Sequence, residues 1–195
     1  MRGAKSAKWV AIAAVVALSA TACGGGSDDG GDSKAAIDPN GTFSVEVGEP
    51  QNPLQPANTM ESNGSIVINS LFAGLVDYDS EGNITMVNAE SVDTEDNKTF
   101  TVELKSGWTF HDGTPVTSES YIKAWNWAAN PDNKQVNSFW FSDIKGYDDV
   151  SGGKADEMSG LKAVDETTFT IELSKALPYF VYKLGYEVFS PLPES

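Results

Sequence analysis

Two segments of this chain alternate strictly between apolar and polar residues, and they constrain the fold more than any other feature. Residues 98–105 read KTFTVELK and residues 167–175 read TTFTIELSK. Side chains on a strand point alternately to opposite faces, so each segment is predicted to be a strand with one buried face and one wet face. The likeness of the two segments predicts that they lie in one sheet. A tandem repeat is not expected, because the flanking sequences differ.

Helical patterns lie between the strand patterns. After Ser62 and Asn63, either of which can cap a helix, apolar residues recur at helical spacing. These residues are Ile68, Leu71, Phe72 and Leu75. A second helix is expected from Ser118 to about Ala129, where Asn-Pro stops it, and a short third helix is expected over 179–184.

The order of the elements indicates the fold class. Residues 42–47 alternate like a half-buried strand, so a strand precedes the first helix. Strands and helices then follow in mixed order, with antiparallel pairing expected between the later strands. This order predicts an α/β (mixed α+β) fold, and it is not typical of a pure barrel or a helical bundle.

The first 40 residues have the pattern of an export signal followed by a tether. A basic start precedes the apolar run WVAIAAVVAL over 9–18, and small residues then lead to Cys23. The stretch ATAC over 20–23 resembles the lipobox of bacterial lipoproteins, although Ala20 stands where that motif usually has Leu. We expect a signal peptide over 1–22, a lipid on Cys23, and a flexible Gly/Ser/Asp-rich tether over 23–40. The alternative is that the apolar run is an N-terminal membrane anchor, but ten residues are too few to span a bilayer.

Composition excludes several classes of function. The net charge is -15, so the surface repels nucleic acid, whose binding needs Lys and Arg. One cysteine permits no internal disulfide, and one histidine without a cysteine cluster leaves no zinc site. A carboxylate-only site for a hard cation is possible in principle, but no loop has the spacing of a calcium site. We expect no metal and no cofactor.

A search for catalytic residues finds no constellation. The only histidine, His111, precedes Asp112, but neighbours on an extended chain point to opposite faces, so the HDGTP segment is interpreted as a turn. The acidic pairs at 148–149 and 156–157 lie in polar, glycine-containing stretches and are expected to be solvated. No nucleophile elbow, phosphate loop or dinucleotide fingerprint is present. We expect a chain that is not an enzyme.

Three consecutive aromatic residues, Phe139, Trp140 and Phe141, follow a polar loop. Because all three cannot face one core, two interpretations stay open. Either two of them pack and one covers an edge, or one lines a ligand cleft.

Several motifs together resemble the peptide and nickel class, family 5, of the solute-binding proteins of bacterial ABC transporters. The signature is FHDGTPVT over 110–117, and further matches follow the family's order. They are LFAGLV over 71–76, NAES over 88–91, TFTVEL over 99–104, LKAVD over 161–165, ALPYF over 176–180 and SPLP over 190–193. DDV over 148–150 with GGKA over 152–155, and the LPYF helix, look most like the oligopeptide-binding members. The family commonly has Trp where this chain has Val92.

The resemblance implies a periplasmic-binding-protein-like II fold, in which two lobes close around a peptide. It assigns 41–57 to an opening strand of the first lobe, 58–185 to an extra subdomain, and 186–195 to a return into the first lobe. Because the chain stops at Ser195, we expect it to be an N-terminal fragment. The implied function is to capture oligopeptides outside the cytoplasm and to deliver them to a permease. The implied partners are the peptide, the permease and the membrane through the lipid, with the protein acting as a monomer.

The resemblance implies that the ligand-contacting positions of the family correspond to residues 58–63 and 137–140 of this chain. Within these stretches we expect Glu61, Ser62, Asn137, Phe139 and Trp140 to bind ligand. For Glu61 and Ser62, helix capping is the alternative role. Two alternative functions are a lipid-anchored secreted hydrolase and a surface lipoprotein that kept the fold without transport.

Overall fold

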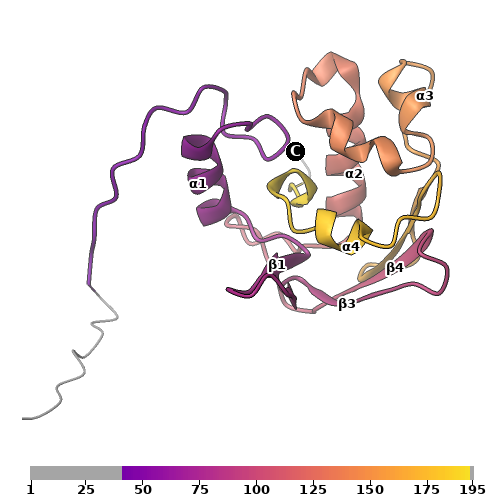
Figure 1. Cartoon of the computed structure of the whole chain (residues 1–195), viewed down its shortest axis with the longest axis horizontal. Coiled ribbons are helices and arrows are strands. Elements are labelled where there is room, and N and C mark those ends of the chain that lie inside the picture. Colours follow the sequence, from indigo (N-terminus) through magenta and orange to yellow (C-terminus); the bar gives the residue numbers. More distant parts are fainter. Residues whose placement is uncertain (1–40, 194–195) are drawn as a thin grey trace, which may run out of the picture. The chain divides into compact units, whose positions relative to one another are not determined.

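A computed structural model describes residues 41–193, in which four α-helices, three 3-10 helices and six strands form (Figure 1). The signal peptide, Cys23 and the tether expected over 1–40 lie outside the described residues. The chain divides into two units, 1–44 and 45–195, and only the second is described at length. The elements are α1 (Ser62–Leu71), β1 (Val76–Tyr78), β2 (Ile84–Met86), β3 (Ala89–Asp93), β4 (Thr99–Leu104), α2 (Ser118–Ala129), η1 (Pro131–Asn133), η2 (Ser138–Asp143), α3 (Tyr147–Ser151), β5 (Leu161–Ala163), β6 (Thr168–Glu172), α4 (Phe180–Lys183) and η3 (Glu187–Phe189).

The two alternating segments form neighbouring strands, as expected. The main sheet has the order β3-β4-β6-β5, and all of its pairs are antiparallel. In the central pair, Phe100 lies opposite Ile171 and Thr101 lies opposite Thr170. Phe100 and Ile171 are fully buried, whereas Thr101 is exposed and Thr170 is partly exposed. The period of two therefore separates an apolar inner face from a polar outer face, which confirms the prediction.

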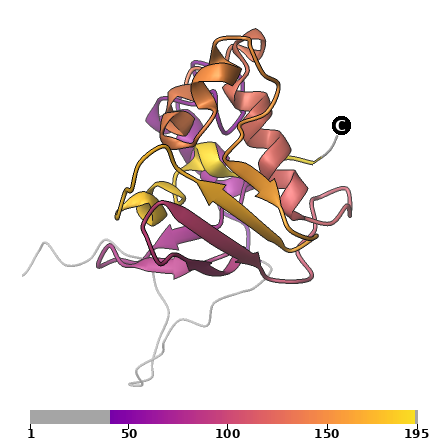
Figure 2. The same ribbon diagram turned by 90° about the vertical axis from the view of Figure 1, so that its right-hand side faces the viewer.

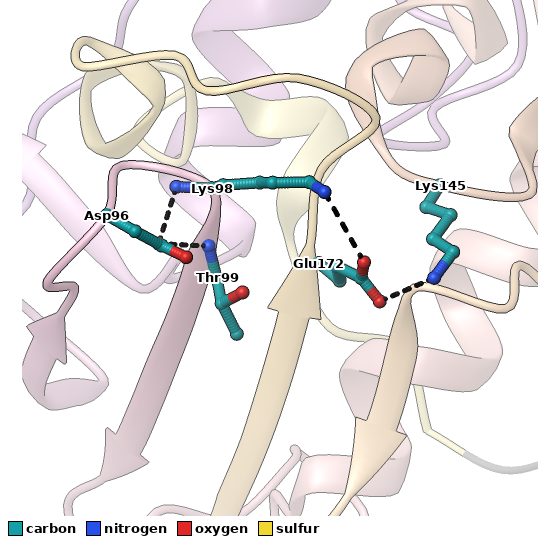
Figure 3. Close-up of polar contacts among 5 residues, drawn as sticks. All are labelled: Asp96, Lys98, Thr99, Lys145 and Glu172. Atoms are coloured by element: carbon teal, nitrogen blue, oxygen red, sulfur yellow. Dashed lines mark hydrogen bonds and ion pairs between the residues drawn. The ribbon is translucent and has the colours of Figure 1, made fainter.

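Polar contacts cross one end of this sheet (Figure 3). Asp96 Oδ1 accepts the backbone N–H groups of Lys98, at 2.8 Å, and Thr99, at 2.7 Å. These hydrogen bonds hold the pKa of the Asp96 carboxyl below its usual value, the bond from Thr99 contributing most. On β6, a hydrogen bond from Lys145 at 2.8 Å lowers the pKa of Glu172, and Lys98 lies 3.8 Å from the same carboxylate. Ionised carboxylates therefore organise this exposed end.

Helix α2 covers the apolar face of the main sheet (Figure 2). Its bounds match the predicted helix, and Ser120 Oγ accepts the backbone N–H of Thr117 at 3.1 Å in a capping box. Tyr121 stacks on Phe169 of β6 with ring centroids 5.6 Å apart. Burial also raises the pKa of the Tyr121 hydroxyl well above its usual value. The core thus joins a helix to a strand that begins 39 residues after that helix ends.

Aromatic rings from late in the chain complete this core. Trp125 of α2 lies edge-on to Phe189, with centroids 5.3 Å apart, and its indole N–H donates to the Phe189 carbonyl at 3.1 Å. Phe180 packs against Phe100 at 5.2 Å. The 187–189 segment and the sheet therefore share one continuous core.

The predicted strand over 42–47 is not present. Residues 41–50 have no regular secondary structure, and Phe43 and Val45 are exposed. A strand needs a hydrogen-bonded neighbour, and no described strand pairs with this segment. The alternating pattern shows which residues could face a core, but it does not show whether a neighbouring strand is present to pair with them.

Among residues 41–193, no helix combines the length and the apolar character needed to cross a membrane. No group of three His, Cys, Asp or Glu side chains in the same residues is placed to hold a metal ion. The short helix expected over 179–184 forms as α4.

Candidate functional site

Asn137 joins the two stretches that were expected to bind ligand. Its side-chain amide donates to the Thr59 carbonyl, and its backbone N–H donates to the Ala57 carbonyl at 2.9 Å. The Asn137 side chain is buried, so these bonds are shielded from water. Residues 57–61 and 137–140, which are far apart in the sequence, therefore lie side by side. We call this contact the Asn137 junction.

The junction leaves several backbone groups of the segment 58–61 without a backbone partner, although Thr59 itself is buried. Thr59 and Met60 are irregular, and Glu61 is extended with φ -135° and ψ 157°. Within the described residues, the N–H groups of Thr59 and Met60 and the carbonyls of Asn58 and Met60 have no backbone partner. Met60 is exposed. A ligand with its own amide groups could pair with this backbone.

Glu61 caps helix α1. Its Oε2 accepts the N–H of Asn63 at 2.8 Å, and its Oε1 accepts the N–H of Gly64 at 2.9 Å. The prediction that Ser62 or Asn63 caps this helix is therefore wrong. A carboxylate with two oxygens satisfies two orphan N–H groups at once, and its charge suits the helix N-terminus. Ser62 is the exposed first residue of the helix.

The stripe expected on α1 is only partly buried. Ile68 is fully buried, but Leu71 is exposed and the helix ends before Leu75. The helix is also held one turn before Ile68 on the same side, where Ser65 Oγ donates to Glu187 Oε1 at 2.6 Å. This bond fixes the helix that follows the junction to η3.

The three consecutive aromatic residues separate into three environments. Phe141 is fully buried and packs on Trp125 and Phe189. Trp140 is partly buried, and its ring lies 4.3 Å from that of Tyr186. Phe139 is exposed. The structure thus places Phe139 and Trp140 one turn beyond Asn137, on the short helix η2.

Trp140 forms one wall of a shallow hollow between η2, α4 and β1, which we call the tyrosine hollow. Its volume is about 460 Å³. Its lining residues are Tyr78, Trp140, Asp143, Tyr179, Tyr182, Lys183 and Tyr186. The site residues predicted from the sequence include only one of these, Trp140.

A Lys–Asp ion pair forms the polar part of the tyrosine hollow. Lys183 Nζ donates to Asp143 Oδ2 at 2.7 Å and to the Trp140 carbonyl at 3.0 Å. The same ammonium lies 5.3 Å from the centroid of the Trp140 ring. Both charged side chains are largely shielded, with 15% of Lys183 and 22% of Asp143 exposed.

Tyr78 closes the hollow from the β1–β2 hairpin. Its hydroxyl donates to the Tyr182 carbonyl, and its pKa is raised, chiefly by burial and further by Tyr186 and Asp77. Gly185 lies against the Tyr78 ring, where a Cβ atom would come within 2.6 Å of it. The hairpin and α4 are therefore in close contact.

The sequence contains a signal for three tyrosines of the hollow, but this signal is not part of the family motifs. Tyr179, Tyr182 and Tyr186 are spaced by three and four residues, which places them on one side of a helical turn. Aromatic residues at this spacing also occur in ordinary buried helices. Only the structure shows that these three stay exposed and meet Trp140.

His111 lies in the turn that the sequence predicted. Phe110 N–H donates to the Thr114 carbonyl at 2.8 Å, which closes the turn. Asp112 Oδ1 accepts the hydroxyl and the N–H of Thr114, and these bonds lower the pKa of Asp112. His111 is exposed at the edge of an apolar hollow of about 520 Å³. The Asp112 carboxylate therefore stabilises a turn.

Residues 83–194 match the family model "Bacterial extracellular solute-binding proteins, family 5 Middle". The oligopeptide-binding protein OppA of Bacillus subtilis is 28% identical over 193 residues, which cover 96% of this chain and 35% of OppA. The periplasmic oligopeptide-binding protein OppA of Salmonella typhimurium is 34% identical over 134 residues, which cover 67% of this chain and 25% of that protein.

Solved structures give the same result. The murein tripeptide-binding protein MppA of Escherichia coli aligns with a TM-score of 0.70 at 30% identity, over 76% of this chain and 30% of MppA. OppA of Listeria monocytogenes, solved with bound peptide, aligns with a TM-score of 0.71 at 28% identity over the same shares. The chain spans about a third of the length of the first curated relatives that it matches.

Proposed function

Because the chain belongs to family 5 of the bacterial extracellular solute-binding proteins, we propose that it helps to capture oligopeptides for an ABC importer. The family and the periplasmic-binding-protein-like II fold predicted from the motifs are both confirmed. Members of this family are binding proteins rather than enzymes. The relatives are extracytoplasmic or periplasmic, so we place this protein outside the cytoplasm as well.

The observation that carries the peptide proposal is the unpaired backbone beside the Asn137 junction, which is exposed at Met60. An extended peptide presents N–H and carbonyl groups along its length, and the 58–61 backbone offers unpaired groups of both kinds. Main-chain pairing of this sort is indifferent to side chains. It therefore suits a protein that accepts peptides of varied sequence.

Among the five expected ligand residues, we propose three different roles. Asn137 holds the 57–59 backbone in place by its two hydrogen bonds. Ser62 and Phe139 offer an exposed hydroxyl and an exposed ring to the ligand. Glu61 and Trp140 are already engaged, in the helix cap and against Tyr186, so they contact ligand only with the groups left free.

The domain plan and the anchoring belong to the same proposal. We infer that 58–185 forms the extra subdomain and that 186–195 returns to the first lobe. We also infer that a lipid on Cys23 keeps the protein at the outer face of the membrane, where permease subunits receive the peptide. The hydrolase alternative has no supporting nucleophile and base pair among the described residues.

The test is titration calorimetry of the full-length protein with a mixture of short peptides. We expect binding heat, and we expect Asn137→Ala to weaken the affinity at least tenfold, equivalent to about 1.4 kcal/mol. Asn133→Ala is the matched control, because Asn133 donates to the Trp127 carbonyl and does not touch 57–61. Heat with nickel chelate or a sugar, and none with peptides, would overturn the ligand class.

A further inference from the structure

The tyrosine hollow is separate from the Asn137 junction and has no role in the proposed peptide contacts apart from its Trp140 wall. Three of its tyrosines are half-exposed, with 59% of Tyr179, 50% of Tyr182 and 47% of Tyr186 accessible. Exposed tyrosines scattered singly need no explanation, but these converge on one concave surface. Tyr and Trp gathered in this way are typical of recognition surfaces.

The charge of the hollow selects the class of ligand. Lys183 and Asp143 form an ion pair that is neutral overall, and they are the only Lys, Arg, Asp or Glu in its lining. An anion would meet the Asp143 carboxylate, and a cation would meet the Lys183 ammonium. A neutral ligand meets neither penalty.

The hydrogen-bonding capacity of the hollow remains partly unused. Asp143 uses Oδ2 for Lys183, so Oδ1 remains to accept a hydrogen bond. The hydroxyls of Tyr179, Tyr182 and Tyr186 can each donate or accept. The hollow therefore offers donors and acceptors around aromatic faces, which carry partial negative charge and attract polarised C–H groups.

The walls are fixed before any ligand arrives. Tyr78 is bound to the Tyr182 carbonyl, and Lys183 is bound to the Trp140 carbonyl. The Tyr186 ring lies against Trp140 at 4.3 Å. A preformed site costs less ordering entropy on binding, so even a small ligand with few contacts can bind.

We propose that the tyrosine hollow binds a neutral saccharide. A sugar ring has C–H faces that stack on tyrosine and tryptophan, and its hydroxyls both donate and accept. The Asp143 carboxylate and the tyrosine hydroxyls pair with those hydroxyls, while the rings cover the apolar face. The volume, about 460 Å³, falls within the usual range for small-molecule pockets.

Calorimetry of the full chain with cellotriose, maltotriose and chitotriose tests this proposal. We expect at least one sugar to bind, Tyr182→Ala to weaken that binding at least tenfold, and Tyr179→Ala to weaken it as well. Trp108→Ala removes an exposed ring outside the hollow and should change the affinity less than twofold. Near-ultraviolet circular dichroism checks that each variant is folded.

Three outcomes would overturn the proposal. The first is that none of the sugars binds, and the second is that both tyrosine variants bind sugar as tightly as the unchanged protein. The third is that sedimentation shows self-association that Tyr182→Ala abolishes. The last result would make the hollow a contact between protein chains. Asn137→Ala, which should weaken peptide binding, should leave sugar binding unchanged, because Asn137 does not line the hollow. The sugar result and the peptide result can therefore fail independently.

Discussion

At the level of single residues, side chains with two hydrogen-bonding groups organise the candidate site. Asn137 ties two carbonyls of one segment, and Glu61 satisfies two N–H groups of the next helix. The sequence predicted both residues as ligand contacts, because they lie in stretches that resemble the family, and this role stays a prediction. For Glu61 it could not decide between capping and ligand binding, since both roles use the same carboxylate oxygens.

The helix cap gives a direct test of that assignment. Glu61→Ala removes both capping bonds of α1 and should lower the free energy of unfolding by about 1 kcal/mol. Ser62→Ala is the matched control, because Ser62 is exposed and does not cap the helix. Urea unfolding measures both variants. Equal losses in the two would contradict the cap seen here.

The aromatic core makes a larger prediction. Phe169 is fully buried between Tyr121 and Trp125, so Phe169→Ala should cost about 3–5 kcal/mol in the free energy of unfolding. Phe139→Ala removes an exposed ring of the same kind and should change stability by less than about 0.5 kcal/mol. Thermal unfolding of the two variants gives the comparison, and similar midpoints would show that Phe169 is not a core residue.

At the level of elements, the sequence predicted the helices and strands whose own residues contain a local pattern for that structure. Helix α2 has apolar residues at helical spacing and an Asn-Pro stop, and β4 and β6 alternate strictly, so all three form where expected. The strand over 42–47 was wrong because a strand also depends on a neighbour, which the local pattern does not encode. For the same reason the tyrosine hollow, built from three separate elements, was found only in the structure.

The contact between the hairpin and α4 can be tested by a double-mutant cycle. Gly185→Ala would bring a methyl group within 2.6 Å of the Tyr78 ring, and it should destabilise the protein by about 1–3 kcal/mol. In a Tyr78→Ala background the same change should cost less than half as much, because the clash has gone. An equal cost in both backgrounds would show that the two residues do not touch.

The acidic end of the main sheet predicts a dependence on pH. The pKa of Asp96 is lowered in the folded protein, so its stabilising contribution is present above the unfolded pKa and is lost as the pH falls through the folded pKa. Asp96→Asn should therefore flatten the decline in stability below about pH 4. Asp156→Asn, at an exposed position outside this group, is the control. Denaturant midpoints measured from pH 6 to pH 2 provide the readout.

At the level of the whole molecule, the charge and the proposed anchor act together. A net charge of -15 keeps the folded part from lying on anionic lipid, so attachment would depend on the lipid rather than on the surface. A cysteine-linked anchor with more than one acyl chain holds a protein where a single chain would not.

Replacement of that cysteine tests the anchor. In cells, Cys23→Ser should move the protein from the membrane fraction to the soluble fraction, because no other anchor is proposed. Peptide affinity in calorimetry should stay the same, since neither candidate site is proposed to use Cys23. Membrane retention of the serine variant would contradict the lipid proposal, and immunoblots of separated fractions decide between the outcomes.

The contact between Trp125 and Phe189 also has a consequence for biogenesis. The ribosome must synthesise Phe189 before the Trp125 indole can pack on the Phe189 ring and donate to the Phe189 carbonyl. Until then the core around Trp125 lacks one of its rings and one hydrogen-bond acceptor, so we expect the nascent chain to be less stable than the finished domain. Such a delay would favour a precursor that must be threaded through a narrow translocation pore, because premature compaction would block its passage.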